Sequence, residues 1–234
     1  LSQYEGLLAP QIQEDLDEQP IVEEFRLFFL KFIKEHKVSL VTGSDVDKSI
    51  EQLGVEILDN VEFCFNCSGN DIYHLGQNIY KADWRLPDEA QEWLSMKLKE
   101  SKFHLRTDNH FEHRTGTCNF SIVGRNANLD ERFEYVIWDT EMNERNNIAK
   151  EFVNKFSNIE AKVGGETGID LYPKGKDKSQ ILDYIEETDL VFYGDKMEKN
   201  ENDYPLVIAI DEKGYGKSIL VTDYIDTWTR LDKI

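Results

Sequence analysis

The order of strand-like and helix-like segments constrains the fold of this chain more than any other feature. Apolar runs that open into loops lie near both ends, at Val38–Asp45 and Leu190–Tyr193. The middle differs, because Phe103–Arg106, His110–Arg114 and Thr117–Val123 are short alternating segments broken by Gly and Asn, which is typical of an antiparallel sheet. The pattern predicts a doubly wound, Rossmann-like α/β core interrupted by an inserted α+β domain.

Periodicity and turn residues predict the remaining elements. Apolar residues at helical spacing predict an amphipathic helix over Ile21–Lys37. Further helices are predicted to begin at Leu86, to span Glu144–Phe156 and Ser179–Glu187, and to close the chain. Further strands are predicted at Val61–Phe65, Glu160–Val163 and Gly168–Tyr172, and two more apolar runs follow at Val207–Ile210 and Ser218–Val221. The core is expected over residues 1–80 and 172–234, with the insert over 81–171.

Charge and cysteine content narrow the classes of partner and compartment. The net charge of −19 would repel phosphate backbones and acidic headgroups, so we expect no nucleic-acid or membrane partner. A small anionic substrate stays open, since a few clustered arginines can reverse the local field. Three cysteines are an odd number and too few for a disulfide scaffold. With no signal segment or long apolar run in the sequence, we expect a cytoplasmic protein.

Three polar groups follow predicted core strands, where sites of such folds usually lie. Thr42-Gly-Ser44-Asp45 offers hydroxyls and backbone amides that suit a phosphate, although Ser and Asp also cap ordinary helices. Lys178 opens a predicted helix and could pair with phosphate or simply be solvated. Asp195 and Asp203 follow Gly194, which allows a sharp turn, and their carboxylates suit Mg²⁺. An acidic, solvated turn is the alternative for this pair.

Arg114, Arg125 and Arg132 lie within the predicted insert of this acidic chain. Arginine forks bind phosphate through two parallel hydrogen bonds, so three of them on one sheet could form a phosphate pocket. Surface ion pairing is the other interpretation of the same residues.

Several motifs occur here in the order seen in phosphomannomutases, a branch of the haloacid-dehalogenase-like superfamily with a C2-type cap. These are Gly43-Ser-Asp…Glu51-Gln-Leu-Gly54, Asn119-Phe-Ser-Ile-Val-Gly-Arg125, Glu131-Arg132, Gly164-Gly165…Asp170, Asp177-Lys178 and Phe192-Tyr-Gly-Asp-Lys…Asn-Asp203. The chain therefore resembles this family from about Phe25 to Asp203.

The resemblance implies a role for each matching residue. It implies that Asp195, supported by Asp203, binds Mg²⁺, and that Ser44 and Lys178 hold the phosphoryl group, with Thr42 a slightly better match to the wider superfamily's hydroxyl position. It assigns the three arginines named above to the distal phosphate of the substrate. It places Asn119 and Asp170 near the sugar.

The chain departs from the family pattern in two places. Gly168 stands where the family has a serine two positions before the cap aspartate, so a sugar or phosphate hydrogen bond is expected to be lost. The family's first motif, Asp-x-Asp-Gly-Thr-Leu-Thr-Pro, best matches Gln3-Tyr-Glu5-Gly-Leu-Leu-Ala-Pro10. Gln3 would replace the aspartate nucleophile and Glu5 the acid–base group. Either the first motif has degenerated, or the true N-terminus is absent from this sequence.

The leading hypothesis is a phosphomannomutase-like protein that binds Mg²⁺ and a hexose phosphate. In an intact relative, the resemblance implies that phosphate moves between C6 and C1 of mannose through an aspartyl phosphate. A non-catalytic binding or assembly protein is the alternative from another class, and a sugar phosphatase is a third reading if the N-terminus is intact. The resemblance also suggests a homodimer formed through the cap.

Overall fold

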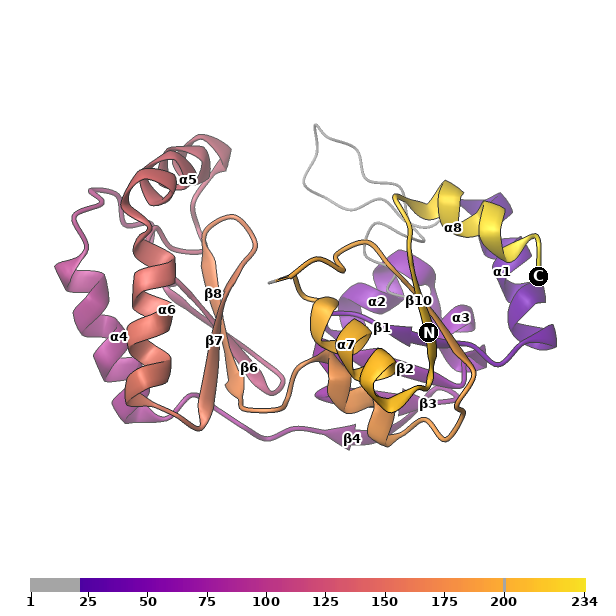
Figure 1. Ribbon diagram of the computed structural model, residues 1–234. Helices are drawn as coiled ribbons and strands as arrows, with labels where there is room; N and C mark the ends of the chain where they lie inside the picture. The colour runs from indigo at the N-terminus through magenta and orange to yellow at the C-terminus, as the bar shows by residue number, and fades with distance from the viewer. Residues whose placement is uncertain (1–21, 200) are drawn as a thin grey trace. The chain divides into compact units, whose positions relative to one another are not determined.

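The computed structural model describes residues 22–199 and 201–234, which divide into two compact units (Figure 1). The core contains the described residues up to Ala82 together with Gly175–Ile234, and the cap contains Asp83–Lys174. The sequence placed these two boundaries near residues 80 and 172. The predicted catalytic positions Gln3 and Glu5 lie outside the described residues.

The described strands of the core form two groups. Four strands are ordered β1-β2-β3-β4, with β1 parallel to β2 and the other neighbours antiparallel. The second group is the parallel pair β9 and β10. Their bounds are β1 Ser39–Val41, β2 Phe63–Asn66, β3 Asp71–His74, β4 Gln77–Lys81, β9 Leu190–Gly194 and β10 Gly216–Leu220. The predicted strands β1 and β2 and the second half of β9 are buried, as expected of an α/β core, whereas β10 is largely exposed.

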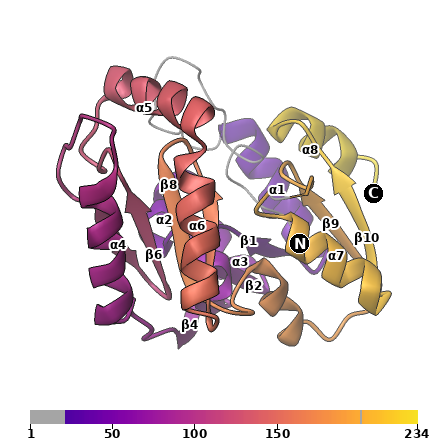
Figure 2. The ribbon, with the colours of Figure 1, turned by 60° about the vertical axis from the view of Figure 1, so that its left-hand side comes forward.

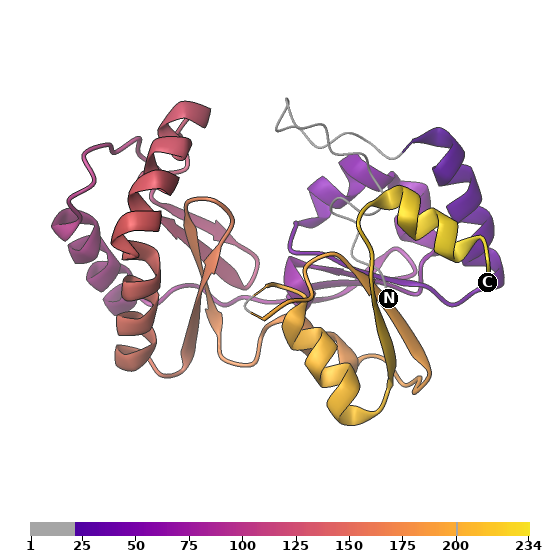
Figure 3. The same ribbon diagram turned by 45° about the horizontal axis from the view of Figure 1, so that its top comes forward.

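Helices cover the core strands and link them. They are α1 Glu23–Glu35, α2 Val46–Leu53, α3 Val55–Asn60, α7 Tyr204–Lys213 and α8 Tyr224–Leu231, with 3-10 turns η1 Cys67–Gly69 and η2 Lys178–Asp183. The apolar stripe predicted for the first helix is buried, and the Phe25 ring stacks on Trp228 of α8 with centroids 5.3 Å apart. The last helix therefore packs against the first described one (Figure 3).

The cap is an antiparallel sheet with helices on one face (Figures 1 and 2). Its strands are ordered β5-β6-β8-β7. Their bounds are β5 Phe111–Arg114, β6 Thr117–Ser121, β7 Ile159–Gly164 and β8 Gly168–Pro173, and the helices are α4 Asp88–Glu100, α5 Leu129–Met142 and α6 Glu144–Lys155. The apolar core of this unit combines side chains from these helices with one face of the sheet.

Strand alternation gives the two faces of the cap sheet different chemistry. Cys118 and Phe120 of β6 enter the apolar core, together with Ile169 and Leu171 of β8. Since successive side chains of a strand point to opposite faces, the residues between them point away from the helices. Asn119 and Asp170, which are neighbours in register, therefore share the helix-free face.

The predicted strand at Phe103–Arg106 is absent from the structure. The Arg106 guanidinium donates to two carbonyl groups of this segment, Phe103 O at 2.6 Å and Leu105 O at 2.7 Å. It also donates to two that precede the segment, Leu98 O at 3.0 Å and Ser101 O at 3.2 Å. These charge-assisted hydrogen bonds from a side chain compete with the hydrogen bonds that a neighbouring strand would make. The segment is an irregular connection between α4 and the sheet.

Two of the helices that were not predicted, α5 and α7, each carry a local sequence signal. Asn128 and Glu131 form a capping box that begins α5. In α7, the apolar run at Val207–Ile210 becomes a helix with a proline in its first turn, and it ends at Gly214 in the left-handed region with φ 64°. Helix α3 and the strands β3 and β4 were also not predicted.

The helix predicted over Ser179–Glu187 is instead the single 3-10 element η2. Side-chain bonds to distant parts of the core hold both ends of the segment. Gln180 donates to the carbonyl of Ser68 at 2.8 Å, and Glu187 pairs with Lys37. These tertiary bonds compete with a regular helix.

No helix among the described residues has both the length and the apolar character needed to cross a membrane.

Replacement of Arg106 by methionine should destabilise the protein by about 3 kcal/mol, because four carbonyl groups lose a charged donor while they stay partly buried. Urea denaturation followed by circular dichroism measures the change. Arg85→Met is the matched control, since Arg85 is an exposed arginine in the same unit. Equal losses in the two variants would contradict the assigned role of Arg106.

Candidate functional site

The loop after β1 is fixed by its own backbone and side chains. Thr42 is fully buried; its amide donates to Phe65 O at 2.9 Å, and its hydroxyl accepts from the Ser44 amide at 3.0 Å. Asp45 caps α2 by accepting from the Lys48 amide at 2.9 Å. Of the two caps that the sequence allowed, Asp45 is the one used. Ser44 is thus held at the carboxyl end of β1, where the sequence predicted a phosphate-binding group.

Lys178 and Asp203 form a buried ion pair in the core. The distance from Lys178 Nζ to Asp203 Oδ1 is 2.8 Å, and the two side chains are 1% and 0% exposed. Lys178 begins η2, whose cap is Asp177, and Asp203 precedes α7. The structure therefore brings together one predicted phosphate ligand and one predicted metal ligand from segments 25 residues apart.

The segment between Asp195 and Asp203 is folded back on itself. The Lys196 amide donates to Asp203 Oδ2 at 3.2 Å, and the Asp203 amide donates to Lys196 O at 3.0 Å. A Cβ atom on Gly194 would lie 2.7 Å from Asp203 Oδ2. Gly194 is therefore required because a side chain here would collide with this carboxylate. The sequence suggested instead that Gly194 allows a sharp turn, which is not its main role.

Asp195 directly follows β9, and one of its carboxylate oxygens has no hydrogen-bond partner among the described residues. Its Oδ1 is buried and has no hydrogen-bond partner in the described part of the chain. Burial raises the pKa of the Asp195 carboxyl; Lys196 opposes this rise and the charge of Asp203 adds to it. A buried, unpartnered carboxylate oxygen beside a second carboxylate is an arrangement that a hard cation stabilises.

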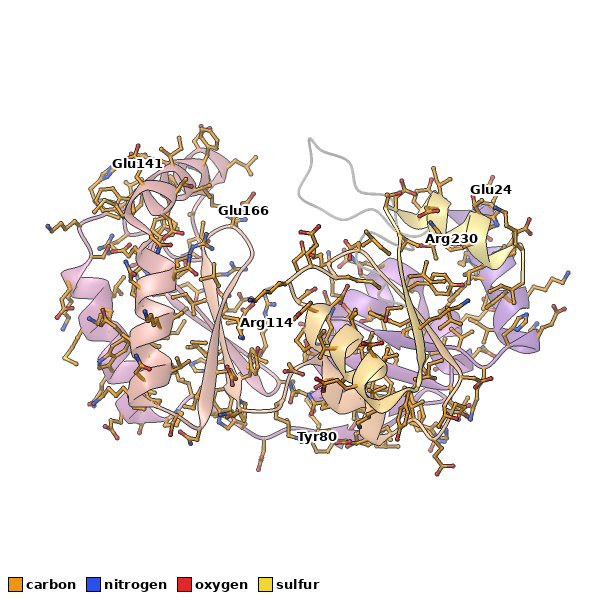
Figure 4. The ribbon with its side chains drawn as sticks, in the orientation of Figure 1. Glu24, Tyr80, Arg114, Glu141, Glu166 and Arg230 are labelled. Atoms are coloured by element: carbon orange, nitrogen blue, oxygen red, sulfur yellow. The ribbon has the colours of Figure 1, made fainter. Side chains whose placement is uncertain are left out.

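In the cap, Glu112 brings two of the predicted arginines together. Arg114, labelled in Figure 4, lies 3.1 Å from Glu112, and Arg125 Nε lies 2.7 Å from the same carboxylate. Arg132 instead donates through Nε to Ala127 O at 2.9 Å. The sequence analysis did not identify Glu112. Its only signal was its position two residues before Arg114, which places both side chains on the same face of a strand.

Asn119 and Asp170 meet across the β6–β8 pair, with Asn119 Nδ2 donating to Asp170 Oδ1 at 2.7 Å. Two glycines make room for this pair. A Cβ on Gly164 would lie 2.1 Å from Asp170 Oδ2, and one on Gly168 would lie 2.4 Å from Asn119 Nδ2. Gly168, which stands where the family has a serine, is thus needed for Asn119 to keep its present position.

Arg145 supports the same hairpin and was also missed. Its Nε pairs with Asp139 at 2.7 Å, while Nη1 donates to Gly165 O at 3.1 Å. The contact ties the start of α6 to the turn between β7 and β8. No local sequence signal indicates it, because the partner carbonyl lies 20 residues away.

Comparison with known proteins decides the family. The model of the eukaryotic phosphomannomutase family matches residues 22–234. The chain belongs to this family. It is 30% identical to the phosphomannomutase of Saccharomyces cerevisiae over 215 residues, which are 87% of this chain and 84% of the relative. It is 31% identical to the phosphomannomutase of Oryza sativa subsp. indica over 196 residues, or 80% and 79% of the two chains.

Solved structures of low sequence identity share the fold of this phosphomannomutase-family chain. The C-terminal domain of trehalose-6-phosphate phosphatase from C. albicans has a TM-score of 0.66 at 14% identity, with 99% of this chain and 90% of that one covered. A haloacid dehalogenase-like hydrolase from Bacteroides thetaiotaomicron has a TM-score of 0.60 at 12% identity, covering 99% and 97%. The predicted α/β haloacid-dehalogenase-like fold is confirmed.

Replacing Lys178 by methionine should destabilise the protein by about 3–5 kcal/mol, because Asp203 would stay buried without its counter-charge. A double variant, Lys178→Met with Asp203→Asn, should lose less than the single one, since the uncompensated charge is gone. Urea denaturation measures both. Lys217→Met, an exposed lysine of the same unit, should change little. Additive losses in the double variant would contradict the coupling.

Proposed function

We propose that this member of the phosphomannomutase family binds a hexose phosphate together with Mg²⁺, and that Gln3 at the nucleophile position limits its turnover. The observation that supports the proposal most is the buried Lys178–Asp203 pair, whose charges act on Asp195, together with the Asp195 oxygen that has no partner among the described residues. This combination supplies a fixed ammonium group and an open carboxylate at the end of β9. Such a pairing suits a dianionic phosphate and a hard cation.

The residues present fit Mg²⁺. Asp195 would bind the ion through its open oxygen. Asp203 would support the site from behind, because its two oxygens already accept from Lys178 and from the Lys196 amide. When bound, the ion would neutralise part of the phosphate charge. No described group of three acidic, histidine or cysteine residues surrounds a common point, so further oxygen ligands must come from water, phosphate or other parts of the chain.

The protein's own residues hold the phosphate and the sugar in this proposal. Ser44 and Lys178 would bind the reacting phosphoryl group in the core. Arg114 and Arg125, already oriented by Glu112, would bind the distal phosphate in the cap, with Arg132 as a third contact. Asn119 and Asp170 would receive sugar hydroxyl groups.

The first motif decides whether binding leads to reaction. In the family mechanism a carboxylate attacks phosphorus, the sugar oxygen leaves, and the acid–base group supplies a proton to that oxygen. Gln3 offers a neutral carboxamide, which is a much weaker nucleophile than a carboxylate. Glu5 keeps a carboxylate but holds it one methylene further out. A non-catalytic binding protein is therefore the second candidate, and this substitution is the observation that favours it. Pairing of two copies through the cap stays a prediction.

A combined binding and turnover measurement tests the proposal. The chain should bind mannose 6-phosphate more tightly with Mg²⁺ than without it. Without the cation, the negative charge of Asp195 would repel the phosphate. With mannose 1-phosphate, Mg²⁺ and a bisphosphorylated hexose, it should show no phosphoryl transfer, whereas the Gln3→Asp, Glu5→Asp double variant should show some.

Each outcome of this experiment separates the candidates. Absence of binding, with or without Mg²⁺, would overturn the proposed function. Turnover by the unaltered chain would show that another group replaces the nucleophile and that Gln3 is not limiting. Binding with no turnover in either protein would favour the non-catalytic protein.

The cap arginines give an independent prediction. Arg125→Met should weaken mannose 6-phosphate binding by about tenfold or more, because a charge-assisted phosphate contact is lost, and Arg125→Lys should recover only part of it. Calorimetric titration measures the affinities. The exposed arginine variant Arg85→Met is the control for net charge. Equal affinities for Arg125→Met and the control would exclude Arg125 from the phosphate site.

A further inference from the structure

The turn η1, which none of the site assignments uses, has a strained backbone. Cys67 and Ser68 both lie in the left-handed region, with φ of 48° and 59°, and Gly69 follows with φ of 91°. Non-glycine residues in this region are strained and persist only where the surroundings fix them. Two such residues in succession, one of them a buried cysteine, therefore need a structural cause.

One side of the turn holds the phosphate-binding loop. The left-handed conformation directs two successive amides to that loop, so that Cys67 N donates to Ser44 O at 2.8 Å and Ser68 N donates to Thr42 O at 2.7 Å. The side chain of Asn70 stabilises the turn by donating to Cys67 O at 2.8 Å. Both amides can face the same loop only because Cys67 and Ser68 adopt the strained left-handed conformation.

The other side of the turn holds the segment of Lys178. Gln180 Nε2 donates to Ser68 O at 2.8 Å and to Lys176 O at 3.3 Å. Its side chain is buried against Gly69, where a Cβ atom would lie 3.0 Å from Gln180 Cγ. Gly69 thus allows both the backbone angle and the close approach of Gln180.

Ser68 is consequently bonded on both sides. Its N–H reaches Thr42, and its C=O receives the side chain of Gln180, two residues from Lys178. Through this one residue the loop after β1 and the segment that carries the ammonium group are joined, although 112 residues separate Ser68 from Gln180.

We propose that Gln180 is a positioning residue, which acts through the strained turn Cys67–Gly69 to hold Lys178 in register with the Thr42–Ser44 loop. The inference rests on the proposed function, since it assigns Gln180 to the same phosphate site. Gln180 itself makes no contact with the phosphate. Its effect is on the spacing of the groups that do.

The variant Gln180→Met keeps the volume of the side chain and removes its donor. We expect mannose 6-phosphate affinity, measured with Mg²⁺, to fall about tenfold. We also expect the amide protons of Cys67 and Ser68 to exchange about tenfold faster by NMR. Gly69→Ala should reproduce both effects by displacing Gln180.

Thr227→Val is the matched control. Thr227 is fully buried in α8 of the same unit and donates to Asp223 O at 3.0 Å, so its loss should lower stability without touching the bridge. Affinity should then equal that of the unaltered chain at a temperature where both are folded. If this control weakens binding as much as Gln180→Met does, the effect of Gln180 is general destabilisation and the proposal is overturned.

The two readouts separate this inference from the proposed function. Faster exchange with weaker binding supports the positioning role. Faster exchange with unchanged affinity overturns it, because the bridge would then be structural only, and unchanged exchange overturns the bridge itself. If the unaltered chain binds no sugar phosphate, the proposed function fails, and the exchange measurement alone decides whether the bridge exists.

Discussion

The buried pair of Lys178 and Asp203 is the interaction on which the rest of the core site depends. Two charges removed from water are tolerated only when each has its partner and its remaining hydrogen bonds. The second oxygen of Asp203 accepts a hydrogen bond from the Lys196 amide. Gly194 has no side chain and so leaves room for this carboxylate. The same contacts fold the loop that presents Asp195. A requirement of electrostatics thus also determines the shape of the candidate metal site.

The cap depends on a different constraint, which is the division of its sheet into an apolar face and a polar one. Helices α4, α5 and α6 cover the face with Cys118 and Phe120, so the opposite face is free for Asn119 and Asp170. Both polar side chains lie against glycines that leave them space. Gly168 therefore changes more than one hydrogen bond relative to the serine pattern, since the Asn119 amide occupies the volume that a side chain there would need.

Membership of the phosphomannomutase family rests on residues 22–234, whereas the proposed change at Gln3 and Glu5 lies outside the described residues. The ion pair, the capped loop after β1 and the arginine–glutamate cluster are held by contacts among described residues. A binding site of this kind can persist when the chemistry at the nucleophile changes. The proposed binding can therefore be tested separately from the proposed loss of turnover.

The sequence alone determined the fold class, the family and most elements, because these depend on periodicity and on motifs whose residues are close together. The stripe of α1 and the alternation of β6 are examples, and the capping box of α5 was readable although not predicted. Tertiary structure decided what each polar group contacts. Arg106 took the carbonyls of an expected strand, Gln180 joined Ser68, and Glu112 joined Arg114 to Arg125. Local sequence determines which backbone conformations have low free energy. Contacts between residues that are distant in the chain depend on the burial of charge and on close packing, and both arise only when the chain folds.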